Sequence, residues 1–173
     1  MKELPEFVHR KVYSNYYLFS DCEILRNESF NKKIKLFSKK ISGEKVVIEM
    51  LLMDWALSHI GSKFFIIPNN ESYSFEKFDE KCIEFGNGSI FFYSSFNFYV
   101  YDETNEWELY CSTTQDIAIF GCNRSILNEF LNIFNPYKEE SFKEKMNWIG
   151  NIFKESYRSE YLNKLKNNYQ FSE

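Results

Sequence analysis

The sequence predicts an α+β fold, in which an antiparallel β-meander of about four to five strands packs against several helices and the chain ends in a long helix. Three observations support this prediction. Aromatic, β-prone segments follow one another between residues 89 and 122, apolar residues at helical spacing lie on either side of them, and 173 residues suit one domain. Hydrophobic residues make up 44% of the chain, which is enough for a core, so we expect a single globular domain over residues 1–173.

The predicted strands are segments rich in aromatic and β-branched residues. Short polar links separate the last four of them, and local connections of this kind favour antiparallel neighbours. The link at residues 102–105, DETN, suits a hairpin turn. The predicted meander comprises residues 89–94, 96–102, 106–112 and 116–122, and a further strand is expected at 63–67. Residues 12–19 are either a strand or an extended N-terminal arm.

Helices are predicted where apolar residues recur every three or four positions. The clearest one is expected to begin at Ser42, a capping residue, and to end at Gly61. It would carry Ile48, Trp55 and His59 on one buried face. Further helices are expected at residues 74–85, from about 125 to 134, and from about 139 to 166. The lysine-rich stretch KKIKLFSKK, around residues 34–37, gives no clear prediction.

The net charge of −4 is unevenly distributed along the chain. Residues 1–50 hold ten Lys/Arg against seven Asp/Glu, residues 51–136 hold four against twelve, and residues 137–173 hold seven against six. An acidic middle argues against nucleic acid as a direct ligand, because phosphate binding needs clustered Lys and Arg. It suits a basic protein partner instead.

The sequence indicates a cytoplasmic protein that does not enter a membrane. The first residues, MKELPEFVHRK, are too charged for a signal peptide, and the longest apolar-rich stretch, residues 46–60, is too short to span a bilayer. The four cysteines are widely spaced, without a CxxC pair, so we expect them to be reduced and partly buried. Neither histidine has a second ligand at metal-binding spacing, and we expect no metal and no cofactor.

Cys122 is the candidate nucleophile, because it is expected to end a strand just before a helix N-terminus, a place that lowers a thiol pKa. No phosphatase-type arginine follows it and no histidine lies near it in the sequence. A small buried residue is the other interpretation of Cys122. The turn FGCNRS has a single glycine, which is far short of a phosphate-binding fingerprint. We interpret His59 as a packing residue at a helix end and His9 as part of a mobile N-terminal region.

Carboxylates are the richest set of candidate functional residues. On the strand at 106–112, alternation places Glu106, Glu108 and Tyr110 on one face and Trp107, Leu109 and Cys111 on the other. Two interpretations stay open, a solvated sheet face or an acidic patch that docks a basic protein. The candidate partner-binding residues are Asp79, Glu80, Glu84, Asp102, Glu103, Glu106, Glu108, Tyr110 and Asp116.

The region from about residue 96 to 134 resembles the immunity proteins of bacterial contact-dependent growth inhibition and other polymorphic-toxin systems. The resemblance lies in an aromatic strand, a D/N turn, a strand with a tryptophan, and the run DIAIFG before a helix. Its residues are Trp107, Asp116, Ile117, Ala118, Ile119 and Gly121. It implies a protein that binds and blocks a cognate toxin domain, often a nuclease, inside the cell.

The sequence therefore leaves three hypotheses. The first is a non-enzymatic immunity protein that neutralises a cognate toxin domain, a basic nuclease, through an acidic surface. The second is a small cytoplasmic enzyme that uses Cys122 or a carboxylate cluster. The third is a generic interaction or regulatory protein of a phage or low-GC bacterium.

Overall fold

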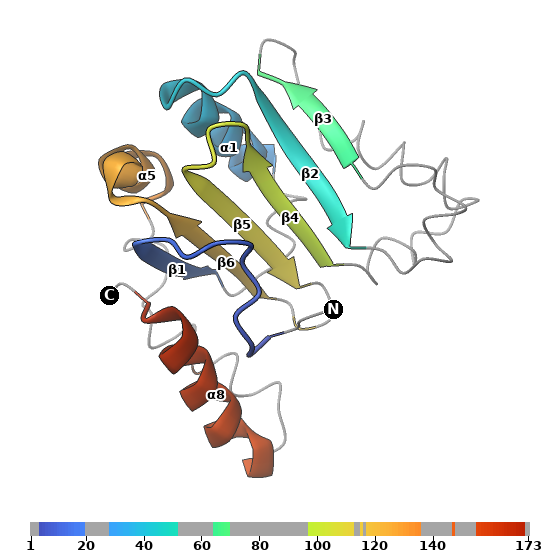
Figure 1. Ribbon diagram of the computed structural model, residues 1–173, viewed down its shortest axis with the longest axis vertical. Helices are drawn as coiled ribbons and strands as arrows, with labels where there is room; N and C mark the ends of the chain where they lie inside the picture. Colours follow the sequence, from blue (N-terminus) through green and yellow to red (C-terminus); the bar gives the residue numbers. More distant parts are fainter. Residues whose placement is uncertain are drawn as a thin grey trace, which may run out of the picture.

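The structure is a computed structural model, and it describes residues 4–19, 28–51, 64–69, 97–112, 115, 117–135, 147 and 155–171. These residues form an α+β fold built on an antiparallel sheet, with helices on its two faces (Figure 1). The predicted fold class is therefore confirmed. The described sheet has six strands, in the order β1-β6-β5-β4-β2-β3, where four to five were expected.

The elements have these bounds in chain order: β1 Asn15–Phe19, α1 Glu28–Lys40, β2 Lys45–Leu51, β3 Phe64–Pro68, β4 Asn97–Asp102, β5 Trp107–Ser112, β6 Ile117–Cys122, a short 3-10 turn η2 Arg124–Ile126, α5 Leu127–Phe134 and α8 Glu155–Tyr169. The predicted strands at 63–67, 96–102, 106–112 and 116–122 match β3 to β6 within one residue at each end. The predicted arm or strand at 12–19 contains β1, so the strand interpretation holds for its second half.

The centre of the sheet is formed by the last three strands of the predicted meander. β4 pairs with β5 and β5 pairs with β6, each antiparallel to its neighbour. β1 joins outside β6, β2 joins outside β4, and β3 lies at the far edge beside β2. Residues far apart in the sequence therefore form one continuous sheet.

The predicted helix from Ser42 to Gly61 is wrong over residues 45–51, which form β2. β2 lies between β3 and β4, and five of its seven residues are buried. An interior strand covered on both faces forms a continuous apolar run, which helical periodicity cannot separate from a buried helix. The β-branched run Val46, Val47, Ile48 was the local evidence for a strand.

The helix in this part of the chain is α1, which covers the unassigned lysine-rich stretch. Phe30, Ile34 and Phe37 are spaced by four and three residues and form its buried face. Ser42 does not begin a helix, since it has a φ of 68° just beyond the C-terminal end of α1. The Gly43 N–H then donates to the Ser38 carbonyl at 2.8 Å, which closes the last turn.

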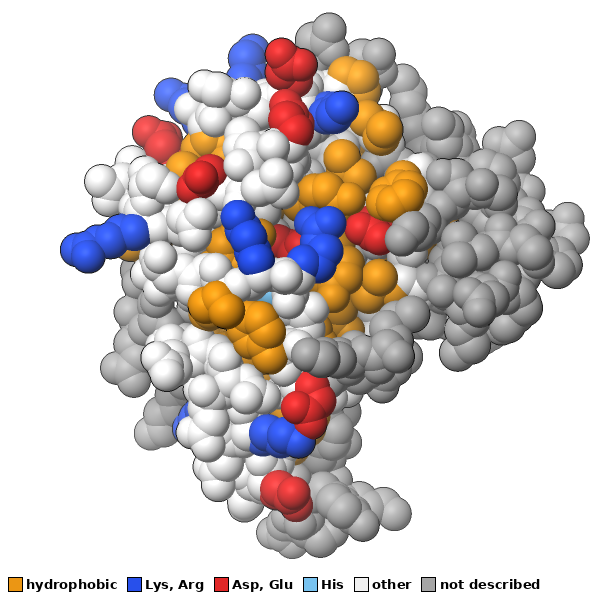
Figure 2. Space-filling view, viewed as in Figure 1, with side chains coloured by type: hydrophobic (Ala, Val, Ile, Leu, Met, Phe, Trp, Pro, Cys, Tyr) orange, Lys and Arg blue, Asp and Glu red, His pale blue; other side chains and the backbone are white. Residues whose placement is uncertain are grey.

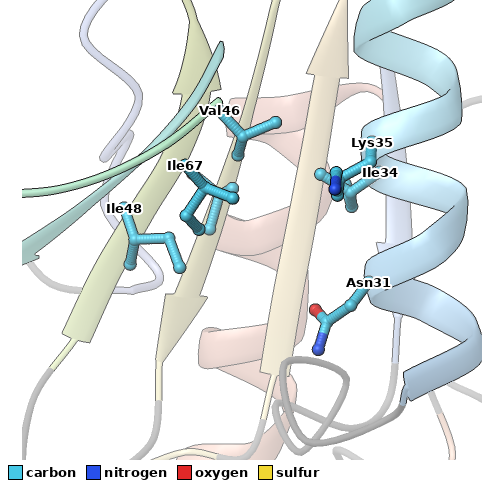
Figure 3. A pocket seen from close by; sticks show the side chains of 7 residues that line it. Asn31, Ile34, Lys35, Val46, Ile48 and Ile67 are labelled. Carbon is cyan, nitrogen blue, oxygen red and sulfur yellow. The ribbon is translucent and has the colours of Figure 1, made fainter. Parts of the chain in front are cut away.

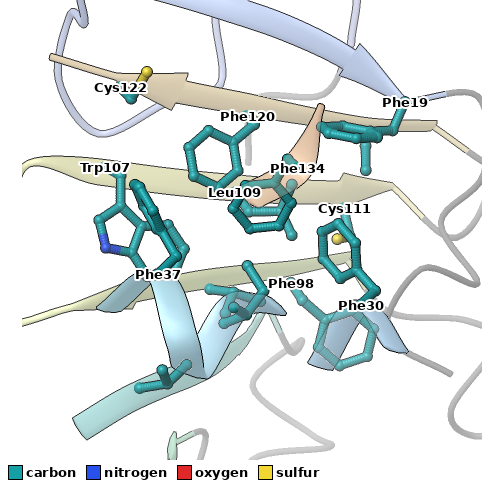
Figure 4. Packing of buried hydrophobic residues seen from close by; sticks show 14 of the residues in the cluster. Phe19, Phe30, Phe37, Phe98, Trp107, Leu109, Cys111, Phe120, Cys122 and Phe134 are labelled. Carbon is teal, nitrogen blue, oxygen red and sulfur yellow. The ribbon is translucent and has the colours of Figure 1, made fainter. Parts of the chain in front are cut away.

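The first hydrophobic core lies between the sheet and the helices α1 and α5 (Figure 4). Trp107 stacks on Phe120 with ring centroids 5.3 Å apart, and Phe37 of α1 meets both rings edge-on. Phe130 of α5 packs on Phe120 at 4.5 Å. As predicted, Trp107, Leu109 and Cys111 share this buried face.

A second core fills the opposite face of the sheet, beneath α8 and an N-terminal segment, residues 4–13, that we call the N-terminal strap (Figure 1). It contains Tyr16, Tyr99 and Tyr110 of the sheet and Tyr161, Leu165 and Tyr169 of α8. The strap lies under α8: the Tyr169 hydroxyl accepts from the Val8 N–H at 2.9 Å and donates to the Glu6 carbonyl at 3.1 Å. The strap therefore contributes directly to this core.

The remaining predicted elements are only partly described. The predicted helix at 125–134 is confirmed as η2 followed by α5, and it ends at Asn135, whose N–H bonds the Leu131 carbonyl. α8 matches the last part of the predicted C-terminal helix, while residues 139–146 and 148–154 lie outside the described residues. The predicted helix at 74–85 and strand at 89–94 also lie outside them. Within the described part of the chain, no helix has the length and apolarity needed to span a membrane.

Candidate functional site

Five of the nine candidate partner-binding residues are described, and all five belong to the β4–β5 hairpin or the strands beside it. Their environments differ sharply. The other four, Asp79, Glu80, Glu84 and Asp116, lie outside the described residues.

Asp102 is fully buried, on the sheet face that packs against α1. One carboxylate oxygen accepts from the Ser38 hydroxyl of α1 at 2.8 Å. The other accepts from the Thr104 N–H at 3.0 Å and from the Thr104 hydroxyl. Asp102 therefore joins the hairpin turn to the end of α1 and offers no surface to a partner.

Glu108 and Tyr110 share one strand face, as predicted, but neither is exposed. The N-terminal strap and α8 cover this face, so the expected solvated or partner-facing surface is not found there. Burial here depends on a long-range contact, because His9 of the strap lies about 100 positions from Glu108 in the sequence. Alternation along β5 predicts a shared face but does not reveal what covers it.

Glu108 is instead the centre of a buried polar cluster. His9 Nδ1 lies 3.0 Å from its Oε1, and the Arg10 N–H donates to the same oxygen at 3.1 Å. Arg10 Nε donates to Oε2. The Arg10 guanidinium also lies 3.5 Å from Glu49 Oε2 and 3.7 Å above the Tyr101 ring. Charge-assisted hydrogen bonds of this kind make burial of a carboxylate tolerable.

The charges of this cluster depend on one another. Burial acts to raise the pKa of Glu108, but the hydrogen bonds and charges of His9 and Arg10 outweigh it and hold the pKa below its usual value. Burial lowers the pKa of His9, against the opposing contact with Glu108. At neutral pH the cluster therefore holds an ionised Glu108 and a neutral His9, whose Nδ1–H is the donor.

Glu103 and Glu106, the hairpin carboxylates, lie at one end of the sheet. Glu103 is exposed and accepts from the Glu44 N–H. Glu106 accepts from Asn123 Nδ2 at 3.0 Å and from the Ser125 hydroxyl at 2.7 Å. The pKa of Glu106 is lowered by these two hydrogen bonds and by the nearby charge of Lys11. Both groups are negative at neutral pH and only partly shielded from solvent.

Two exposed apolar side chains, Ile66 and Phe64, lie on the edge strand β3. Together with Val47, which is buried, and Tyr101, which is partly buried, they form a surface that we call the β3 corner. Ile66 is 59% exposed and Phe64 is 42% exposed. The register places Ile66, Val47 and Tyr101 side by side on β3, β2 and β4. Figure 2 shows hydrophobic side chains grouped on this side of the sheet face, with charged side chains among them.

The apolar corner and the hairpin carboxylates are neighbours. Glu103 is two residues beyond Tyr101, which corresponds to about 7 Å along an extended chain. Arg10 lies on the Tyr101 ring, so the strap borders the exposed apolar surface. The described surface therefore combines an apolar centre with an acidic margin.

Cys122 has the opposite of a nucleophile's environment. It is fully buried in the first core, and burial raises the pKa of its thiol to about 12. It therefore stays a thiol at neutral pH, and the thiol does not act as a nucleophile. The packing interpretation of Cys122 fits its position.

A small hollow opens between α1 and the β2–β4 part of the sheet (Figure 3). Aliphatic side chains form most of its wall, with Asn31 and Lys35 of α1 at one side. The lining holds no carboxylate, histidine or cysteine, so it offers no acid, base or nucleophile. Among the described residues there is also no group of three or more His, Cys, Asp and Glu placed to hold a metal ion.

The roles of His9 and Arg10 were not predicted from the sequence. His9 was assigned to a mobile region. In the structure it is buried, and its ring packs against Tyr16 of β1 and Tyr169 of α8. Nothing in the local pattern of residues 4–13 indicates this contact, because it is made with β5, β1 and α8.

Comparison of the chain with protein-family models, with curated proteins and with solved structures finds no match.

Proposed function

We propose that this chain is a non-enzymatic binding protein that neutralises a cognate toxin domain, in the manner of a bacterial immunity protein. The observation that carries the proposal is the β3 corner, where Ile66 stands exposed in a row with Val47 and Tyr101. Apolar and aromatic residues surrounded by polar groups are typical of the centre of a protein interface.

The partner in this proposal is a basic domain, such as a nuclease. Glu103 and Glu106 beside the corner carry negative charge, which speeds association with a basic surface and orients it. Asp79, Glu80, Glu84 and Asp116 are further candidates for this acidic margin, and they lie outside the described residues. Asp102, Glu108 and Tyr110 stabilise the scaffold in this proposal and do not contact the partner.

The enzyme hypothesis has less support. Cys122 is buried as a thiol, and the carboxylates of Asp102, Glu106 and Glu108 are engaged in hydrogen bonds that hold the hairpin and the strap. No described cavity brings an acid and a base together. The proposal therefore rests on a surface and not on a catalytic cleft.

The test is binding to the toxin domain encoded beside this gene, with rescue of cells that express it. We expect a stable complex and restored growth. Ile66→Ser should raise the Kd at least about tenfold, because it removes an apolar side chain from the interface centre. Leu36→Ser is the matched control, since Leu36 is similarly exposed but lies on α1, on the opposite sheet face.

Charge reversal tests the acidic margin. Glu103→Lys with Glu106→Lys should slow association about tenfold at low salt and weaken its salt dependence, whereas Glu160→Lys on α8 should leave both unchanged. Absence of binding and of rescue would contradict the function itself. Binding that neither Ile66 nor the glutamates affect would contradict this surface.

A further inference from the structure

The N-terminal strap carries a histidine whose surroundings suit only the neutral ring. His9 is fully enclosed, and among the described residues no atom hydrogen-bonds its Nε2. The rings of Phe7, Tyr13, Tyr16 and Tyr169 surround it, with centroids 5.4 to 6.1 Å away. A proton on Nε2 would create a buried N–H donor with no acceptor, in addition to a charge.

His9 is also central to how the strap is attached. Its Nδ1 contacts Glu108 of β5, and Arg10 next to it contacts the same carboxylate and Glu49 of β2. The backbone of the strap is tied by the Tyr169 hydroxyl of α8 and the Tyr99 hydroxyl of β4, both at Val8. The strap is thus held by polar contacts, several of which centre on one buried carboxylate, in addition to the apolar packing of Leu4, Val8 and Tyr13 in the second core.

We propose that the N-terminal strap is a pH-sensitive clasp, which docks on the sheet with His9 neutral and releases as the pH falls from about 7.5 to about 5.5. Release uncovers the aromatic face of β4 and β5 around Tyr99 and Tyr110. It also loosens α8, because Lys164, Asn168 and Tyr169 make their polar contacts with the strap. The proposal does not depend on the identity of any partner.

Of His9 and the titratable groups that face it, His9 is the one that changes its protonation state between pH 7.5 and 5.5. Two of these groups belong to the sheet, Glu108 of β5 and Tyr16 of β1. The strap contributes Arg10 and Tyr13, and α8 contributes Tyr169. The pKa of Glu108 lies below its usual value and that of Arg10 above. Burial raises the pKa of all three tyrosines above 10. None of these groups changes charge between pH 7.5 and 5.5.

The sign of the effect follows from the direction of the His9 shift. Burial lowers the pKa of docked His9 below the ordinary histidine value of about 6.5, so His9 binds a proton more tightly in the detached strap. Docking is therefore fully favoured above about pH 6.5 and is lost as the pH falls toward the docked pKa. Between pH 7.5 and 5.5 the equilibrium shifts toward release by up to about tenfold.

Amide hydrogen exchange of the full chain at these two pH values tests the clasp, with each rate divided by that of an unstructured peptide at the same pH. The amides of Val8, Arg10 and Tyr13 report on docking, because each donates to a side chain across the strap contact. Their protection should fall about tenfold in the wild type, and the amides of β5 and β6 should lose much less.

Two variants separate titration from packing. His9→Asn keeps an N–H donor at the place of Nδ1 but cannot titrate, so strap protection should change less than about twofold between the two pH values. Val12→Asn, at a strap position that is 77% exposed, should keep the tenfold change of the wild type. For each variant, the protection at pH 5.5 is compared with the protection at pH 7.5. A variant whose strap docks more weakly at both pH values therefore still gives a result.

Proton NMR of the imidazole rings is an independent measurement, in which His59→Gln leaves His9 as the sole histidine. The His9 midpoint should lie below 6.5. Unchanged wild-type strap protection, an equal loss in His9→Asn, or a His9 midpoint at or above 6.5 would each overturn the proposal.

Discussion

Cys122 illustrates how burial decides the chemistry of a residue that the sequence leaves ambiguous. Its position at the end of β6 and before η2 suggested an activated thiol, but the side chain points into the first core (Figure 4). Desolvation raises its pKa to about 12, and η2 is too short to offset this. A cysteine of this kind acts as a small apolar side chain.

We expect Cys122 to resist alkylation in the folded protein. With a thiol pKa near 12, it should react roughly a thousandfold more slowly at pH 7.5 than an ordinary cysteine. Iodoacetamide labelling followed by peptide mass spectrometry measures this rate, and labelling in denaturant shows that the peptide is detectable. Fast native labelling of Cys122 would restore the nucleophile hypothesis.

Glu106, just before β5, and Glu108, within it, are two residues apart, yet their roles differ. Glu108 is buried between His9 and Arg10, whereas Glu106 is held at the surface by Asn123 and Ser125. Glu108→Gln removes the negative charge that Arg10 Nε contacts and should lower the free energy of unfolding by about 3 kcal/mol.

Glu106→Gln is the matched control for that substitution and should cost less than about 1 kcal/mol, because an exposed charge contributes little. Urea unfolding at pH 7.5 gives both values. Equal effects of the two substitutions would show that the buried cluster does not stabilise the fold.

At the scale of elements, the junction between α1 and β2 was the point where the sequence prediction failed. The same residues, Ser42 and Gly43, that suggest a helix start stand at a helix end, because a left-handed residue followed by glycine closes α1. Residues such as these indicate that a helix boundary is near, but they do not show whether the helix begins or ends there.

Substitutions at these two adjacent positions should act in opposite directions. Ser42→Gly should raise the free energy of unfolding by about 1 kcal/mol, because glycine adopts a φ of 68° without a steric cost. Gly43→Ala should lower it, since the added Cβ would lie 2.3 Å from Ser38 Oγ and 2.6 Å from Asp102 Oδ2. Thermal or urea unfolding measures both, and a stable Gly43→Ala would contradict the packing at this junction.

β5, which shows two-residue alternation, and α5, which has a helical apolar face, were predicted correctly. Trp107, Leu109 and Cys111 alternate with polar residues, and the bounds of β5 follow directly. β2 was missed because its residues are buried on both faces and carry no alternation. α1 was missed because lysines between Phe30, Ile34 and Phe37 hid a regular apolar face.

The molecule as a whole has two cores on opposite faces of one sheet. Ile117 and Ile119 pack in the second core with α8 and the strap, whereas Trp107 and Leu109 pack in the first. The N-terminal strap and α8 are therefore both needed to complete the second core.

The stability of the whole molecule should fall in acid because of Glu108. Its folded pKa lies below the usual value, so its contribution is complete above about pH 4.5 and is lost as the pH falls through the folded pKa. Urea unfolding at pH 5.5, 4.5 and 3.5 should show a smaller loss for Glu108→Gln than for the wild type. Parallel pH profiles for the two proteins would contradict this assignment.

The sequence by itself determined the α+β class, the strands β3 to β6, α5 and the alternation that separates Trp107 from Glu108. These features depend on local periodicity and on turn residues, which neighbouring positions encode. Only the tertiary structure decided that Glu108 is buried and that Ile66 is exposed. The reason is that burial depends on which distant segment covers a face, and the strap reaches β5 from about 100 residues away.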